Sequence, residues 1–221
     1  MDKFDVYCRT MPSLAGPSIF IDFEGNKDQF PVLLGVLVHE ESGESFNQFI
    51  LDDLFHPMSP SSRHPQLLNQ SLEVVLRKLT DRYERSTPIY SWSTHEQQVI
   101  DEYLAGTPLG IEWVDRITDA KISAKKWARQ TYPNHNFVRK EMRGKHTLDQ
   151  YLELINYSVP KIHGAGLTGK RISNVRVMLE KGRTPDDFPR SVKTYWTNML
   201  AHNRHDCFGL KALMDHVISN G

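Results

Sequence analysis

Two apolar runs near the beginning of the chain constrain its fold more than any other feature. Residues 18–24 (SIFIDFE) lie between two glycine-containing turns, and residues 31–38 (PVLLGVLV) form a nearly continuous apolar segment. Short apolar runs between turn residues are typical of strands, and a run without polar alternation is typical of a buried central strand. The sequence therefore predicts a sheet in which residues 45–51 (SFNQFIL) form a third strand in meander order.

Helical and extended segments alternate along the rest of the chain. Residues 68–79 carry apolar side chains at the spacing of one buried helical face, whereas residues 88–92 and 111–117 are interpreted as a fourth and a fifth strand. Strands followed by alternating helices and strands predict an α/β domain with a mixed sheet flanked by helices. We expect this domain to span residues 18–221, after a tail or edge segment at residues 1–17.

Composition excludes several classes of protein. The 221 residues are 39% hydrophobic and 24% charged, which suits one well-buried domain. No apolar run approaches the roughly 20 residues of a membrane span, and the first residues lack the apolar core of a signal peptide. Cys8 and Cys207 are too few for a disulfide framework. We therefore expect a cytoplasmic protein without a membrane partner.

The formal net charge of zero hides an asymmetry along the chain. Residues 1–115 contain 8 Lys and Arg against 18 Asp and Glu, whereas residues 116–204 contain 18 Lys and Arg against 7 Asp and Glu. Such a division can concentrate carboxylates in one place and offer a polyanion a docking surface in another. Two solvated faces that differ in charge would give the same counts, so both interpretations stay open.

Asp22 and Glu24 lie two residues apart on the first predicted strand. Because side chains alternate along a strand, both carboxylates point to the same face. Ionised carboxylates on a central strand are costly to desolvate unless a cation pairs with them, and carboxylate oxygens suit Mg²⁺ or Mn²⁺. The alternative is a strand end at which both acids reach solvent, which the following Gly25-Asn26 allows.

Glu96 follows the fourth predicted strand, in the segment YSWSTHE. Its place just beyond a strand end is where open α/β sheets keep their functional sites. Ser93 and Glu96 also have the spacing of a capping box, in which Glu96 would accept a hydrogen bond from the Ser93 amide. The sequence leaves the two roles open.

His202 and Asp206 are four residues apart on the final predicted helix and therefore share a face. Leu210, Leu213 and Val217 continue that face, so Asp206 is expected to point inward, where an acid needs a partner. The pair suggests a metal ligand beside a general base, or else a His–Asp pair that satisfies itself. His205 lies on another face and is expected to be solvated.

The segments IFIDFEG, IYSWSTHE and HNRHDCFGL, in this order, resemble the motifs of the DEDD exonucleases of the ribonuclease H-like superfamily. The resemblance covers roughly residues 18–218 and is closest to bacterial RNase H-like exonuclease domains with Glu in the second motif. It implies a ribonuclease H-like fold, which has a five-stranded mixed sheet with helices on both sides.

The resemblance also implies a set of site residues. Asp22 and Glu24 match the first motif, Glu96 stands where many members have Asp, and Asp206 matches the last motif. His202 stands where one subfamily has Tyr four residues before the final Asp, while another has His five residues before it. The four acids would hold two Mg²⁺ or Mn²⁺ ions, and His202 would accept the proton of the attacking water.

A glycine-rich segment at residues 164–170 (GAGLTGK) matches a phosphate-binding P-loop in spacing only. That motif requires a preceding strand and a Ser or Thr after the lysine, whereas a helix is predicted before it and Arg171 follows it. We interpret the segment as a flexible basic loop whose Lys170 and Arg171 contact a nucleic-acid backbone. Aromatic residues interleaved with Lys and Arg in residues 121–145 suit single-strand stacking or belong to the core.

Together these features predict a two-metal-ion-dependent 3′→5′ exonuclease that hydrolyses phosphodiester bonds of DNA or RNA, most simply at a single-stranded 3′ end. The alternative is a non-catalytic nucleic-acid-binding or interaction module with the same fold.

Overall fold

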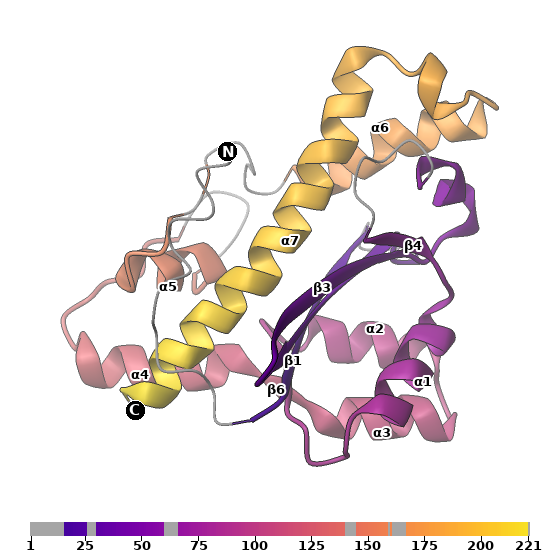
Figure 1. Ribbon diagram of the computed structural model, residues 1–221. Coiled ribbons are helices and arrows are strands. Elements are labelled where there is room, and N and C mark those ends of the chain that lie inside the picture. Colours follow the sequence, from indigo (N-terminus) through magenta and orange to yellow (C-terminus); the bar gives the residue numbers. More distant parts are fainter. Residues whose placement is uncertain are drawn as a thin grey trace.

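The computed structural model describes residues 16–25, 30–59, 66–139, 145–158, 160 and 167–220. Within these residues, six strands form one mixed sheet in the order β4-β3-β2-β1-β5-β6 (Figure 1). Strands β1, β2 and β3 form the predicted antiparallel meander, and β4, β5 and β6 each run parallel to a neighbour. The strands are β1 (Ser18–Glu24), β2 (Leu33–Glu40), β3 (Gly43–Ile50), β4 (Leu67–Asn69), β5 (Ile89–Ser91) and β6 (Ile117–Asp119).

Helices cover both faces of this sheet. Figure 1 shows α1, α2 and α3 on one side, with the long α7 crossing the other side and α4 and α5 packed beside it. Several helices begin at capping residues that the sequence displays: the Ser71 hydroxyl accepts from the Val74 amide before α1, and Thr107 caps α3. The helices are η2 (Asp53–Met58), α1 (Leu72–Arg82), α2 (His95–Tyr103), α3 (Pro108–Arg116), α4 (Ala120–Thr131), α5 (Leu148–Leu154), α6 (Thr168–Glu180), η4 (Pro185–Asp187) and α7 (Arg190–Ser219).

The side-chain alternation of β1 separates two hydrophobic cores. Ile19, Ile21 and Phe23 pack into the core beneath α1, α2 and α3. Phe20 belongs to the core under α4, α5 and α7. Because Asp22 and Glu24 share the parity of Phe20, both carboxylates lie on the face that α7 covers.

A third core anchors α6 and the first half of α7 to the sheet edge. Phe55 of η2 stacks on Trp196 of α7 with ring centroids 6.0 Å apart. Arg176 of α6 donates to the Asp52 carboxylate at 2.6 Å, and both side chains are largely buried. These contacts place the first turn of α6 beside the α7 face of the sheet.

The prediction of five strands was wrong by one. Residues 67–69 form β4, although Leu68 had been assigned to the following helix; the Ser71 cap starts that helix only at Leu72. A three-residue strand is too short to show alternation, so its pairing with β3 was invisible in the sequence.

Residues 111–117 are not a strand. They belong mostly to α3, and β6 begins only at Ile117. Thr107 and Pro108 are favourable residues at the start of a helix. Within this helix the Trp113 indole is buried in the core, and its Nε1 donates a hydrogen bond to the Thr80 hydroxyl at 2.9 Å.

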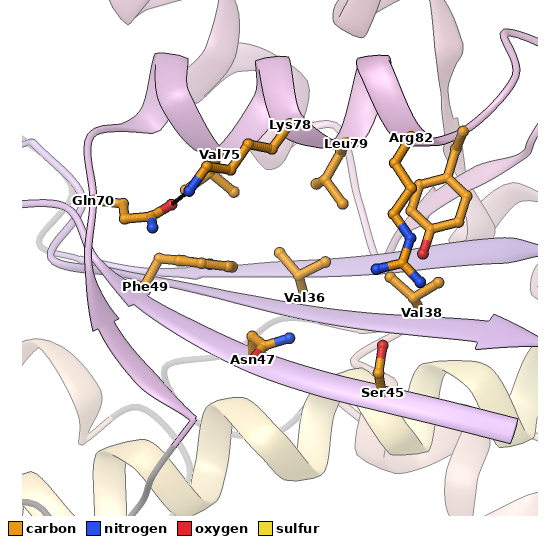
Figure 2. A pocket seen from close by; sticks show the side chains of 11 residues that line it. Val36, Val38, Ser45, Asn47, Phe49, Gln70, Val75, Lys78, Leu79 and Arg82 are labelled. Atoms are coloured by element: carbon orange, nitrogen blue, oxygen red, sulfur yellow. Dashed lines mark hydrogen bonds between the residues drawn. The ribbon is translucent and has the colours of Figure 1, made fainter.

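A cavity of about 130 Å³ lies between α1 and strands β2 and β3 (Figure 2). Its wall is mainly apolar, with Val36, Phe49 and Leu79 among the lining residues, and Arg82 lies at one end. Val36 belongs to the core beneath α1, so the cavity lies on the face opposite the carboxylates of β1. No helix in the described parts of the chain is long and apolar enough to cross a membrane.

Burial on α1 gives a test of this packing. Leu76 is 0% exposed, so Leu76→Ala should lower the free energy of unfolding by about 2–5 kcal/mol through lost transfer energy and a residual cavity. Val74 on the same helix is 43% exposed, and Val74→Ala should change stability by no more than about 0.5 kcal/mol. Urea denaturation of both variants measures the difference, and equal losses would contradict the placement of α1.

Candidate active site

The first strand places two carboxylates inside the fold. Glu24 ends β1 and is 7% exposed, while Asp22 is partly buried in the middle of the strand between β2 and β5. In the register of the sheet, Asp22 lies opposite Gly35 and Glu24 opposite Leu33 of β2. The strand end therefore does not leave both acids in solvent, as one interpretation of the sequence allowed.

Helix α7 brings a histidine and a third carboxylate to the same place. His202 lies between two acids, with its Nε2 4.0 Å from Glu24 Oε1 and its Nδ1 3.5 Å from Asp206 Oδ1. The His202 side chain is 20% exposed and that of Asp206 26%. Solvent therefore reaches this side of the acid cluster.

Glu96 lies in the first turn of α2 and is 4% exposed. Its carboxylate accepts hydrogen bonds from the Ser93 and Glu96 amides, while the Ser91 hydroxyl donates to the Ser93 carbonyl at 2.7 Å. Only half of the predicted capping box is present, because the Ser93 hydroxyl accepts from the His95 amide at 3.3 Å. Glu96 Oε2 is buried and has no hydrogen-bond partner among the described residues, so capping does not use the whole carboxylate.

The carboxyl groups of this site raise one another's pKa values. Burial raises the pKa of Asp22 well above its ordinary value, and the charge of Asp206 raises it further, while a hydrogen bond from Asn203 opposes both. Burial also raises the pKa of Glu24, and the negative charges of Asp22, Asp206 and Glu96 raise it further. Burial and then the charge of Asp22 raise the pKa of Glu96 to about 8.

This pattern means that Asp22, Glu24, Glu96 and Asp206 share one electrostatic site. We name these four residues the acid cluster. Full ionisation of the acid cluster is unfavourable unless positive charge enters it.

The donor chemistry of the acid cluster fits hard divalent cations such as Mg²⁺ or Mn²⁺. It supplies carboxylate oxygens only, and one of them, Glu96 Oε2, is buried without a hydrogen-bond partner among the described residues. The carboxylates as they stand do not close around a point: within the described residues, no group of three or more His, Cys, Asp or Glu is placed to hold a metal ion.

Two residues of the site were missed in the sequence. Asn203, next to His202 on α7, donates from Nδ2 to the Asp22 carboxylate at 2.8 Å and to the Asp22 carbonyl at 2.9 Å. Gln48 of β3 donates to Asn203 Oδ1 at 2.8 Å. The one sequence feature that could have indicated them is Gly35, a glycine inside an otherwise apolar strand, which is a sign of close approach by another group.

Lys170 and Arg171 do not lie in a loop. Both are in the first turn of α6, with Lys170 exposed and Arg171 7% exposed. Burial and the neighbouring acids raise the pKa of Glu24, and the Arg171 charge opposes them. Arg171 therefore faces the acid cluster. Residues 161–166, which hold the start of the glycine-rich segment, lie outside the described residues.

The expectation that His205 is solvated was wrong. His205 is 5% exposed and packs against Tyr157 with ring centroids 5.4 Å apart. The 30-residue helix α7 is covered on more than one face, because α6 and the α4–α5 region pack on it from different directions.

Basic side chains gather on the helix that follows β6. The parallel strands β1, β5 and β6 end at the same edge of the sheet, and β6 leads directly into α4, about 10 Å from β1. Helix α4 contains no acid, and Lys125 and Arg129 line a shallow hollow on it. We name these basic residues the α4 surface: Lys121, Lys125, Lys126, Arg129 and Lys145.

An aromatic cluster connects the α4 surface to the acid cluster. Trp92, four residues before Glu96, packs on Tyr151 at 5.2 Å, and Tyr151 stacks on Phe137 at 4.7 Å. His146 Nδ1 lies 2.7 Å from the Tyr151 hydroxyl oxygen. Burial lowers the pKa of His146, as do the charges of four Lys and Arg residues of the α4 surface. Trp127, for which the sequence left stacking and core roles open, is 1% exposed and belongs to the core.

Comparison with known proteins adds no identification: no model of a known protein family matches the chain, and no curated protein sequence matches it.

The raised pKa values give the metal-free protein a pH-dependent stability. A carboxyl group with a raised pKa holds its proton more tightly in the folded chain. Its stabilising contribution is therefore complete below the unfolded value of 4.5 and, for Glu96, is lost as the pH rises to about 8. We expect the Tm in EDTA to fall between about pH 5 and about pH 8, and Glu96→Gln to reduce that fall.

Glu73→Gln is the matched control, since Glu73 is exposed on α1 and pairs with Arg77 at 2.7 Å. It should leave the slope of Tm against pH unchanged. A Glu96→Gln slope equal to that of the unmodified protein would show that Glu96 does not contribute to it.

Proposed function

We propose that this protein is a two-metal-ion-dependent 3′→5′ exonuclease with a ribonuclease H-like fold that acts on DNA or RNA. The observation that carries the proposal is the acid cluster, in which carboxylates from β1, α2 and α7 raise one another's pKa values inside the fold. Such clusters of perturbed acids at strand ends are more typical of functional sites than of structural ones.

The sheet supports the fold part of this proposal. An antiparallel meander is followed by two strands parallel to its first strand, and the sixth strand, β4, is a three-residue addition at the edge beyond β3. The remaining five strands equal the number that the resemblance to DEDD exonucleases implies.

Each residue of the site has a chemical task in this proposal. Asp22, Glu24, Glu96 and Asp206 would hold two Mg²⁺ or Mn²⁺ ions, which when bound lower the pKa of a water and stabilise negative charge at phosphorus. His202, between Glu24 and Asp206, would accept the proton of the attacking water. Arg171 would orient a phosphate oxygen from the opposite side.

The α4 surface and the aromatic cluster favour nucleic acid as the substrate. Lys and Arg neutralise backbone phosphates without regard to sequence, and partly exposed aromatic rings such as Trp92 can stack on an unpaired base. In this proposal, a single strand bound there extends its 3′ end to the acid cluster.

A second function, a non-catalytic nucleic-acid-binding module, is favoured by one observation. The positive charge of Arg171 already acts on the Glu24 carboxylate. A protein that uses Arg171 as a permanent counterion would bind nucleic acid and leave it intact.

Degradation of labelled strands separates the two functions. With Mn²⁺ or Mg²⁺, 5′-labelled single-stranded DNA or RNA should shorten stepwise from the 3′ end, and EDTA should stop the reaction. Asp22→Asn and Asp206→Asn should each lower the rate roughly 100-fold or more, because even partners outside a ligand shell are worth 10–100-fold. Both variants should be at least as stable as the unmodified protein in EDTA, since repulsion between acids is relieved.

Asp215→Asn is the control on the same helix, because it breaks the buried pair with Lys211 at 2.7 Å without touching the acid cluster. It should keep the rate. Intact strands that remain bound would establish the non-catalytic module, and wild-type turnover in either acid variant would refute the two-metal assignment.

Binding to the α4 surface is tested without catalysis. Lys125→Ala combined with Arg129→Ala should weaken binding of a single strand in EDTA and reduce the slope of log K against log salt by about 1–2. Arg77→Ala combined with Lys78→Ala removes the same charge from α1, on the other side of the sheet, and should leave binding unchanged. Fluorescence anisotropy at several salt concentrations measures both, and equal effects would place the nucleic acid elsewhere.

A further inference from the structure

A row of three residues crosses the sheet beneath α7. In the strand register, Asp22 of β1 lies beside Gly35 of β2, and Gly35 lies beside Gln48 of β3. Adjacent residues in register point to the same face, so the Asp22 and Gln48 side chains flank a position without a side chain. Asn203 of α7 occupies that position: a Cβ built on Gly35 would lie 2.3 Å from Asn203 Oδ1.

Hydrogen bonds fix the orientation of the Asn203 amide. The Leu200 carbonyl can only accept, so the Gln48 atom 2.9 Å from it must be the donor Nε2. The same Nε2 donates to Asn203 at 2.8 Å, so Oδ1 of Asn203 faces Gln48. Nδ2 of Asn203 is thereby directed at Asp22, where it donates to both the carboxylate and the backbone carbonyl.

Burial makes this arrangement more than a surface contact. Asn203 is 0% exposed and Gln48 4%, so each unpaired donor or acceptor would be costly. A glycine in the middle of a central strand also weakens the strand unless another group needs the space. Gly35 thus leaves the space that the Asn203 amide occupies, and this amide donates to the Asp22 carboxylate.

We propose that Gln48 and Asn203 are positioning residues that orient the Asp22 carboxylate for metal binding, with Gln48 acting through Asn203. This inference rests on the proposed function, because it assigns Asp22 to a metal site. Neither residue touches substrate. They hold one oxygen of the Asp22 carboxylate, Oδ2.

The affinity for Mn²⁺, measured by electron paramagnetic resonance titration of the full chain without nucleic acid, tests the proposal. Asn203→Leu keeps the branching and the number of side-chain heavy atoms and removes both donations, so it should weaken Mn²⁺ binding roughly 10–100-fold. Gln48→Met should weaken it by roughly 10-fold, because Asn203 can then turn its amide. The double variant should bind no more weakly than Asn203→Leu alone, since Gln48 acts only through Asn203.

Met199→Ala is the stability control. Met199 is 1% exposed, one turn before Asn203 on α7, and packs in the third core, so its truncation should lower the Tm and leave Mn²⁺ affinity unchanged. If Asn203→Leu and Gln48→Met behave like Met199→Ala, or if their effects on affinity simply add, the positioning role is overturned.

Asp22→Asn separates this inference from the proposed function. If the unmodified chain binds Mn²⁺ and Asp22→Asn abolishes binding, unchanged affinity in Asn203→Leu overturns the positioning role alone. If the unmodified chain does not bind Mn²⁺, the metal-dependent function fails and the positioning role fails with it.

Discussion

Four carboxylates share the space between a central strand and a long helix, and much of the surrounding structure limits the electrostatic cost of that arrangement. Buried acids repel one another and lose hydration, which raises the pKa values of Asp22, Glu24 and Glu96. Asn203 donates to Asp22, and the positive charge of Arg171 acts on Glu24. Apolar residues at these positions would avoid that repulsion, so the buried acids lower the stability of the fold.

The scaffold holds these groups from several directions. Strand β1 lies between two hydrophobic cores, so its position is fixed by packing on both faces. The third core, with Phe55 stacked on Trp196, fixes α6 and with it the buried Arg171. Helix α7 extends from this third core across the sheet to α4, and it carries Asn203, His202 and Asp206 in consecutive turns. One helix therefore carries three residues of the site and packs against both α6 and α4.

The sequence predicted the acids better than the groups that surround them. Asp22 and Glu24 were found because strand periodicity forces two acids onto one face, and Glu96 because it follows a strand end. Asn203 and Gln48 have no spacing of their own: they meet across 155 positions of the chain, and polar residues in a helix or edge strand are ordinarily solvated. His205 was misjudged because helical periodicity cannot show that a helix is covered on several faces. Arg171 was misjudged because the glycine-rich segment was interpreted as a loop, whereas α6 begins at Thr168.

By itself, the sequence determined the α/β class, the antiparallel meander and the carboxylates of β1, because these follow from local periodicity and from the cost of burying charge. Only the tertiary structure decided which residues compensate that charge. The role of Gly35 is visible only from the register of β1, β2 and β3 and from the position of Asn203 on α7, which packs over them. Such long-range packing brings together Asp22, Gln48, Asn203 and Arg171, and no local pattern in the chain encodes their proximity.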